Sequence, residues 1–192
     1  MRILLTGFEP FGQFSTNSSW EVAQAVAKLC TEEQTDCRVE QLPVSFGRVG
    51  DTLRCLIAEH QPDVVLMLGQ ASSADSIRLE RVTLNLMDAR GADNDGFAPS
   101  ELPIDEVGEA AYFTRMPIKQ LREALLNEGV EATISNSAGL YVCNRTYYEA
   151  LRLVAEGTIR SALFVHLPCI KEESGWSVEK MCRAVMIIIR NL

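Results

Sequence analysis

The sequence predicts an α/β fold: a single three-layer α/β/α domain around a twisted, mainly parallel (mixed) sheet. Short apolar runs alternate with amphipathic helical segments along the whole chain. The 192 residues are 47% hydrophobic and 23% charged, which suits one globular domain over residues 1–192. No internal repeat, low-complexity tract or linker divides the sequence.

The N-terminal third of the chain alternates strands and helices. Residues 2–6 (RILLT) are an apolar run followed by glycine, which is typical of a buried strand. The next helix is expected to start at Ser18, which has capping-box spacing to a glutamate. Residues 37–44 predict a second strand, and Pro43 favours either an edge strand or the end of a strand. A helix with apolar residues from Val49 onward follows, and then DVVLML predicts a strand covered on both faces.

The middle of the chain holds an alternating segment and then a loop. In IRLERVTLNLMDA, Glu80 has the same parity as Val82 and Leu84, so its carboxylate is expected to face apolar residues and to need a partner. Residues 91–103 are rich in Gly, Asn, Asp and Pro and predict an irregular loop. A helix with Pro117 in its first turn and the strand VEATIS come next.

The C-terminal third carries two reactive side chains. Cys143 stands at the start of a helix that runs to about Glu156, and His166 lies near the carboxyl end of the buried strand SALFVHLP. A last helix is expected to be capped near Ser174 or Ser177. Reactive residues of parallel α/β sheets gather at the carboxyl ends of strands, so the thiol and the imidazole are expected to lie close together.

These positions predict a catalytic triad. A thiol at a helix N-terminus is activated by the unpaired N–H groups, which can also hold an oxyanion. Only two histidines are present; His60 ends a helix and is expected on the surface, which leaves His166 as the base. Glu80 would orient the base and Cys143 would be the nucleophile. A core thiol and a core histidine are the structural alternative.

The composition of the chain argues against a metal cofactor and against some classes of binding partner. The six cysteines form no CxxC pair and have no zinc-site spacing to histidine, so free thiols and no metal are expected. The net charge is −8 and the basic residues are scattered, which argues against nucleic acid and anionic membranes as partners. No signal peptide or membrane span of ~20 residues is evident, so a cytoplasmic protein is expected.

Four motifs carry a family resemblance. TGFEPFG, LERVTLNLMDAR, SNSAGLYVCN and FVHLP occur in the order and spacing that resemble pyroglutamyl peptidase type I, also called pyrrolidone-carboxylate peptidase. The resemblance implies a cytosolic cysteine exopeptidase, commonly homotetrameric and without cofactor, that removes N-terminal pyroglutamate from peptides through a thioester. It implies that Glu80, Cys143 and His166 are catalytic.

The resemblance also implies a substrate pocket. Its walls would be Phe8, Phe11, Val44 and Val142, which suit a neutral lactam. Two further polar residues would support the reaction. Gln70 would lie near the site, and Arg90 would assist the oxyanion unless it forms an ordinary salt bridge.

The chain departs from the family pattern at two loops. It has FGQ and NSSW where members often have FGG and NPSW, so Gln13 and Ser18 are expected to alter the loop that covers the pocket. It has DARGADN for DARIPDN, so Gly91 and Ala92 replace a bulky residue and a proline. Altered loop order or affinity is expected.

Two other functions remain as alternatives. A catalytically silent relative would bind the pyroglutamyl group without turnover. A nucleoside phosphorylase-like enzyme, whose chemistry occurs on α/β folds of this kind, would need phosphate and would remain active after Cys143→Ala.

Overall fold

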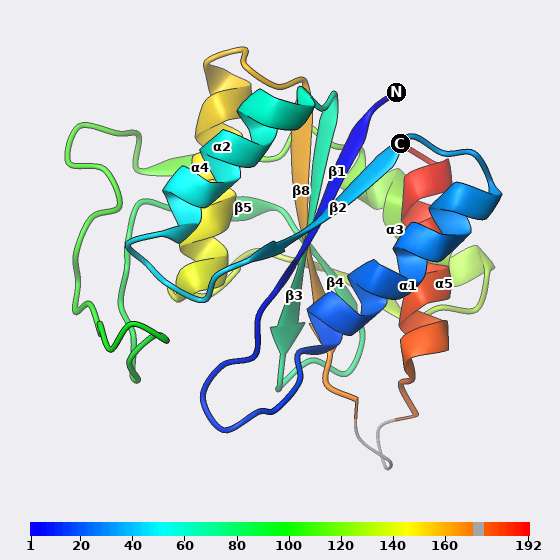
Figure 1. Cartoon of the computed structure of the whole chain (residues 1–192), viewed down its shortest axis with the longest axis horizontal. Helices are drawn as coiled ribbons and strands as arrows, with labels where there is room; N and C mark the ends of the chain where they lie inside the picture. The colour runs from blue at the N-terminus through cyan, green and yellow to red at the C-terminus, as the bar shows by residue number, and fades with distance from the viewer. Residues whose placement is uncertain (171–174) are drawn as a thin grey trace.

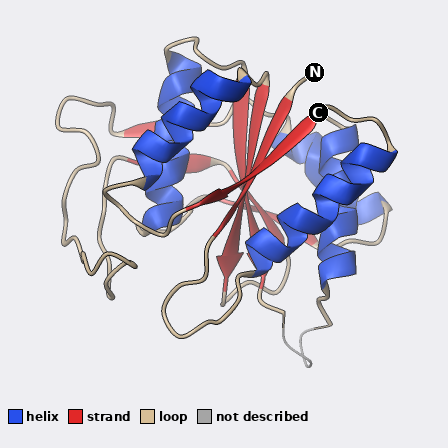
Figure 2. Cartoon of the chain, viewed as in Figure 1, coloured by secondary structure: helices blue, strands red, loops and turns tan. Residues whose placement is uncertain are grey.

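The computed structural model describes residues 1–170 and 175–192, which form a central sheet with helices on both faces (Figures 1 and 2). The strands are β1 (Ile3–Phe8), β2 (Cys37–Leu42), β3 (Val64–Ala71), β4 (Ile77–Glu80), β5 (Val82–Leu84), β6 (Ala111–Phe113), β7 (Ala132–Ser135) and β8 (Ser161–Pro168). The helices are α1 (Ser18–Glu32), α2 (Val49–His60), α3 (Ile118–Asn127), α4 (Val142–Ala155) and α5 (Val178–Arg190). None of the helices in these two ranges is long and apolar enough to cross a membrane.

The main sheet has six strands in the order β2-β1-β3-β8-β4-β7. All neighbouring pairs are parallel except β4 and β8, which are antiparallel. The predicted mainly parallel, mixed sheet is therefore confirmed, and β2 lies at the edge as its proline-flanked sequence predicts.

Two apolar cores lie between the sheet and its helices, one on each face of the sheet. Alternate residues of the strands point to opposite faces, so Leu66 and Val165 pack with α1, α3 and α5, whereas Met67 and Phe164 pack with α2 and α4. Figure 1 shows the same division of helices. Because both faces are covered, β1, β3 and β8 are apolar along most of their length.

The alternating segment after β3 forms two strands instead of one. β4 ends at Glu80, and β5 pairs with β6 in a separate antiparallel sheet. The expected apolar face shared by Glu80, Val82 and Leu84 is wrong, because Leu84 lies outside the main sheet and is 37% exposed. Glu80 is nevertheless fully buried, since β4 lies beside β8 in the main sheet.

Helix ends differ in detail from the predictions. The N-cap of α1 is Asn17, whose side chain accepts the N–H of Ser19, so the capping box at Ser18 is wrong. Pro117 is the N-cap of α3 and lies just before its first turn. Ser177 caps α5 as predicted, and the alternative cap Ser174 lies outside the described residues.

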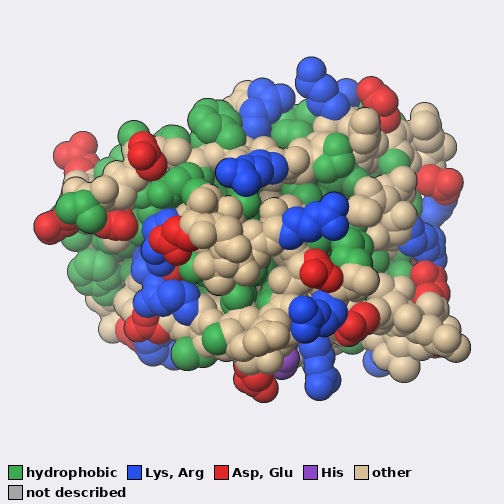
Figure 3. All heavy atoms as spheres, turned by 90° about the horizontal axis from the view of Figure 1, so that it is seen from above, with side chains coloured by type: hydrophobic (Ala, Val, Ile, Leu, Met, Phe, Trp, Pro, Cys, Tyr) green, Lys and Arg blue, Asp and Glu red, His purple; other side chains and the backbone are tan. Residues whose placement is uncertain are grey.

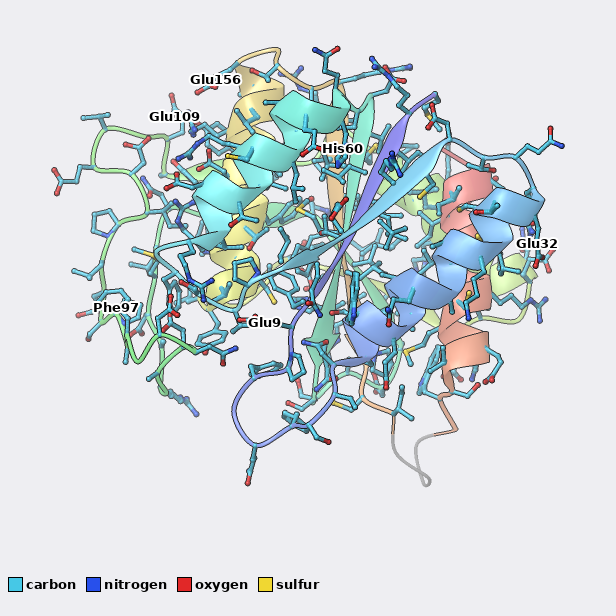
Figure 4. All side chains as sticks on the ribbon, in the orientation of Figure 1. Glu9, Glu32, His60, Phe97, Glu109 and Glu156 are labelled. Carbon is cyan, nitrogen blue, oxygen red and sulfur yellow. The ribbon has the colours of Figure 1, made fainter. Side chains whose placement is uncertain are left out.

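His60 ends α2 as predicted, but it is half-buried rather than fully exposed. Its side chain is only 13% exposed and its Nε2 lies 3.3 Å from Glu40 Oε1 on β2 (Figure 4). This contact between the end of α2 and the edge strand β2 depends on tertiary packing, which sequence periodicity alone does not reveal.

Candidate active site

The carboxyl ends of β3 and β8 and the first turn of α4 meet at one edge of the sheet. In the register of β3 and β8, Gly69 lies opposite His166. Cys143 is the second residue of α4. A Cβ atom at Gly69 would lie 3.1 Å from Cys143 Sγ and 2.7 Å from the ring of Phe164. A glycine at this position therefore leaves room for the thiol against β3, next to the strand that carries the imidazole.

An ion pair joins the predicted base to the predicted acid. His166 Nδ1 lies 2.8 Å from Glu80 Oε1, and both side chains are buried. The ring of Phe164 packs against the imidazole with 4.8 Å between centroids. This bond occupies Nδ1 and leaves Nε2 as the nitrogen available to Cys143.

The surroundings of His166 favour its charged form. Burial alone would lower the pKa of the imidazole, because it disfavours the charge. Hydrogen bonds to Cys143 and Glu80, together with the negative charges of these two groups, outweigh burial and raise the pKa to about 9. At neutral pH the imidazole of His166, which lies between Glu80 and Cys143, therefore carries a proton on both nitrogens.

The first turn of α4 offers donors beside the thiol. Its N-cap, Tyr141, makes no side-chain capping bond. The N–H groups of Val142, Cys143 and Asn144 have no acceptor among the residues that the structure describes, as expected for the start of a helix. They are available to an oxyanion formed at the carbon that Cys143 attacks.

Asn144 fixes this turn in place, and sequence analysis did not single it out. Its side chain is fully buried. Its Oδ1 accepts from Thr83 Oγ1 at 2.8 Å and from Leu84 N at 3.0 Å, and its Nδ2 donates to the carbonyls of Leu84 and Leu86. The only signal in the sequence is that a carboxamide side chain directly follows the cysteine at the helix start. A buried position there would ordinarily hold an apolar side chain, and a buried carboxamide needs hydrogen-bond partners.

A cavity of about 260 Å³ opens in front of the thiol and the imidazole. Its lining is mostly apolar or uncharged: Phe8, Phe11, Asn17, Val44, Gln70, Ala71, Ser72, Ser73, Ala138, Tyr141, Val142, Cys143 and His166. All four predicted wall residues and Gln70 are thus brought together. Arg90 is exposed and does not line the cavity, so the structure does not bring it to the thiol.

Ser18 fixes the orientation of Gln70. The backbone N–H of Ser18 donates to Gln70 Oε1 at 2.8 Å. Because a backbone N–H can only donate, the oxygen of the carboxamide must face Ser18. The Nε2 of Gln70 is then a donor without a partner among the described residues, on a side chain that lines the cavity.

The loop that contains Gly91 and Ala92 is tied to the cavity walls by hydrogen bonds. Tyr141 Oη donates to the Ala92 carbonyl at 3.0 Å. Asp93 accepts the backbone N–H of Phe46 at 2.8 Å and also those of two residues within its own loop. These bonds order the segment although it lacks the proline of the family pattern.

Glu9 links the first loop to the opposite wall. Its Oε1 accepts from Val44 N and from Asn94 Nδ2, each at 2.9 Å. Figure 4 shows Glu9 where the chain leaves β1. As a result, Phe8 and Phe11, which lie on either side of Glu9 in the chain, are held across from the 91–97 segment.

Within the described residues, no group of three or more His, Cys, Asp or Glu side chains is placed to hold a metal ion. A thiol, an imidazole and a carboxylate in successive contact, at the carboxyl edge of an α/β sheet, define a cysteine-type hydrolase. Comparison with known proteins identifies the family within this class of hydrolases. Residues 1–189 match the family model described as pyroglutamyl peptidase, and the chain belongs to that family.

Relatives match over nearly the whole chain. The pyrrolidone-carboxylate peptidase of Thermococcus onnurineus is 39% identical, with 99% of this chain and 98% of the relative covered. The crystal structure of Bacillus amyloliquefaciens pyroglutamyl peptidase I has a TM-score of 0.90 at 34% identity, covering 97% of this chain and 93% of that one. Pyrrolidone carboxyl peptidase of Pyrococcus furiosus has a TM-score of 0.91 at 33% identity, covering 100% and 97%.

Proposed function

We propose that this chain is a cysteine exopeptidase that hydrolyses the bond after an N-terminal pyroglutamyl (5-oxoprolyl) residue of peptides, with residues 1–192 acting as one catalytic domain. The observation that carries the proposal is the 2.8 Å contact between His166 and Glu80, beside a thiol at the start of α4 and at the mouth of one cavity. The matched family and relatives support the substrate class.

In the first half of the reaction, the Cys143 thiolate attacks the pyroglutamyl carbonyl carbon, and an S–C bond forms. The carbonyl oxygen becomes an oxyanion, which the free N–H groups of the first turn of α4 stabilise. The tetrahedral intermediate collapses, the C–N bond breaks, and His166 Nε2 gives its proton to the leaving amine. A thioester remains on the enzyme and the shortened peptide departs.

In the second half, water attacks the thioester carbonyl while His166 takes a proton from the water. The C–S bond breaks, free pyroglutamate leaves, and the thiolate is restored beside the imidazolium. Glu80 holds Nδ1 throughout, which keeps Nε2 directed at the reacting atoms. No metal or cofactor takes part.

The cavity suits the lactam ring. Phe8, Phe11, Val44 and Val142 provide apolar walls for a small neutral ring that carries no ammonium group. Gln70 Nε2 provides a donor for the ring carbonyl, with its orientation set by Ser18. Arg90 is proposed only as a distant positive charge for the oxyanion, because it is exposed.

A homo-oligomer, and a tetramer by family resemblance, is the proposed assembly in the cytoplasm. Support comes from exposed large apolar side chains in the region from β5 to β6. They are Leu84, Phe97, Leu102, Val107 and Phe113, with exposures from 37% to 96%. Sedimentation analysis of the intact protein measures the assembly directly.

The function is tested with a pyroglutamyl fluorogenic amide, using the wild type and Cys143→Ala, with and without iodoacetamide and with and without phosphate. The proposal predicts thiol-dependent release of the fluorophore that does not need phosphate and that is absent in the variant. Activity that needs phosphate and survives Cys143→Ala would instead show phosphorylase-like chemistry. Binding of pyroglutamate without any turnover would show a silent relative.

A further inference from the structure

A second and larger hollow, of about 870 Å³, lies at the opposite edge of the sheet from the thiol. Arg2, Asp63 and Arg160, which directly precede β1, β3 and β8, belong to its lining. Since the active site lies at the carboxyl ends of β3 and β8, the two cavities are separated by the length of the strands. Figure 3 shows this edge from above, with several Lys and Arg side chains spread over it.

The lining combines guanidinium groups with an apolar surface. Its charged members are Arg2, Arg54, Arg115, Arg160 and Asp63, and its apolar members include Ile57, Leu153, Val154 and Ile159. Four positive charges therefore accompany one carboxylate. A pocket of this size with a few convergent charged groups is suited to a small organic ligand.

Three of the four guanidinium groups have no partner in the described chain. Arg54 is engaged, because it lies 2.7 Å from Glu149 Oε1 and also pairs with Asp51. The side chains of Arg2, Arg115 and Arg160 make no hydrogen bond or ion pair with any described residue.

Asp63 offsets only part of this charge. Its carboxylate accepts the backbone N–H of Arg2 at 2.7 Å. That hydrogen bond, with the nearby charges of Arg2 and Arg160, holds the pKa of Asp63 below its usual range. With Asp63 ionised, the three unpaired guanidinium groups leave the hollow with an excess of two positive charges.

The hollow is locally positive although the whole chain has a net charge of −8. Elsewhere in the described chain, Arg48, Arg152, Arg183 and Arg190 pair with carboxylates, whereas Arg38, Arg81 and Arg90 are single exposed or half-buried positions outside the hollow. The planar guanidinium group matches the geometry of phosphate oxygens, which accept several charge-assisted hydrogen bonds at once.

We propose that this hollow binds a phosphorylated organic anion of about nucleotide size, with its phosphates held by Arg2, Arg115 and Arg160. The body of the ligand lies against the apolar surface that Ile57 and Leu153 contribute. A phosphate chain is favoured over a single carboxylate because it supplies enough acceptor oxygens for three guanidinium groups. The site is separate from the peptidase chemistry and does not depend on it.

The test is isothermal titration calorimetry of the full chain with ATP, pyrophosphate and adenosine at 0.15 M salt. The double variant Arg115→Ala with Arg160→Ala removes two of the proposed contacts. The matched control, Arg38→Ala with Lys119→Ala, removes the same charge from exposed residues outside the hollow. Hydrolysis of the pyroglutamyl amide is measured in parallel, and both double variants are expected to keep it.

The proposal predicts saturable ATP binding that is about tenfold weaker or more in the hollow variant and unchanged in the control. It also predicts tighter binding of ATP than of pyrophosphate or adenosine alone. Absence of saturable ATP binding, or an equal loss in the control variant, would overturn the site. ATP binding no tighter than pyrophosphate would overturn the role of the apolar surface.

Discussion

Replacing Glu80 with Gln keeps the size of the side chain but removes its charge from the contact with His166 Nδ1, which is 2.8 Å long and buried. A hydrogen bond to a charged group contributes about 1.5–3 kcal/mol. If that stabilisation is realised when His166 carries a proton in the transition state, kcat/KM falls about 10- to 150-fold. Glu80→Asp keeps the charge and is expected to retain more activity.

The pH profile gives an independent measure of the same contact. The pKa of His166 is raised from 6.5 to about 9, so the stabilisation of its charged form is fully present below pH 6.5 and is lost as pH rises through about 9. Without the negative charge of Glu80, this pKa falls because burial is less well compensated. The alkaline limb of kcat/KM should move to lower pH in Glu80→Gln, with near-native circular dichroism. A fall below about threefold with an unmoved limb would refute the reasoning.

The remaining predictions concern the residues around the triad. Ser18→Pro removes the N–H that orients Gln70, whereas proline suits the first position of a helix. KM should therefore rise about 2- to 12-fold with kcat nearly unchanged. Ser18→Ala keeps the N–H, and an equal rise in KM there would contradict the role of this N–H in orienting Gln70. Gly69→Ala should displace the thiol of Cys143 and lower kcat/KM by about 100-fold. Gly47→Ala is the control, because a Cβ atom there would meet no other atom within 4 Å. Equal kcat/KM values for the two variants would refute the close approach of the thiol to Gly69. Asn144→Ala should cost at least about 2 kcal/mol in urea unfolding, since it leaves buried polar groups unpaired; a loss under ~0.5 kcal/mol would count against its anchoring role.

The central sheet and the grouping of Cys143, His166 and Glu80 at one edge of it were predictable because their signals are local. Continuous apolar runs identify β3 and β8 as strands covered on both faces, and His166 lies near the carboxyl end of one of them. A helix start identifies the position of Cys143. The burial of Glu80 was predicted for a partly wrong reason, since β4 and β5 belong to different sheets.

Other features depend on contacts between distant segments, which periodicity does not encode. The three-residue strand β6 is defined by its pairing with β5 and is too short to show a period of its own. Asn144 reaches a segment 58–61 residues earlier in the chain. The bond from Ser18 to Gln70 joins a helix start to a strand end, and neither residue type predicts the other.

The covalent step is the central claim, and trapping the acyl-enzyme tests it most directly. The intact protein is mixed with an excess of a pyroglutamyl amide, quenched in acid at early times and digested for peptide mass spectrometry. The mechanism predicts one added pyroglutamyl group on the peptide that contains Cys143, and none in Cys143→Ala. An acyl group on another residue, or full turnover by Cys143→Ala, would contradict the account.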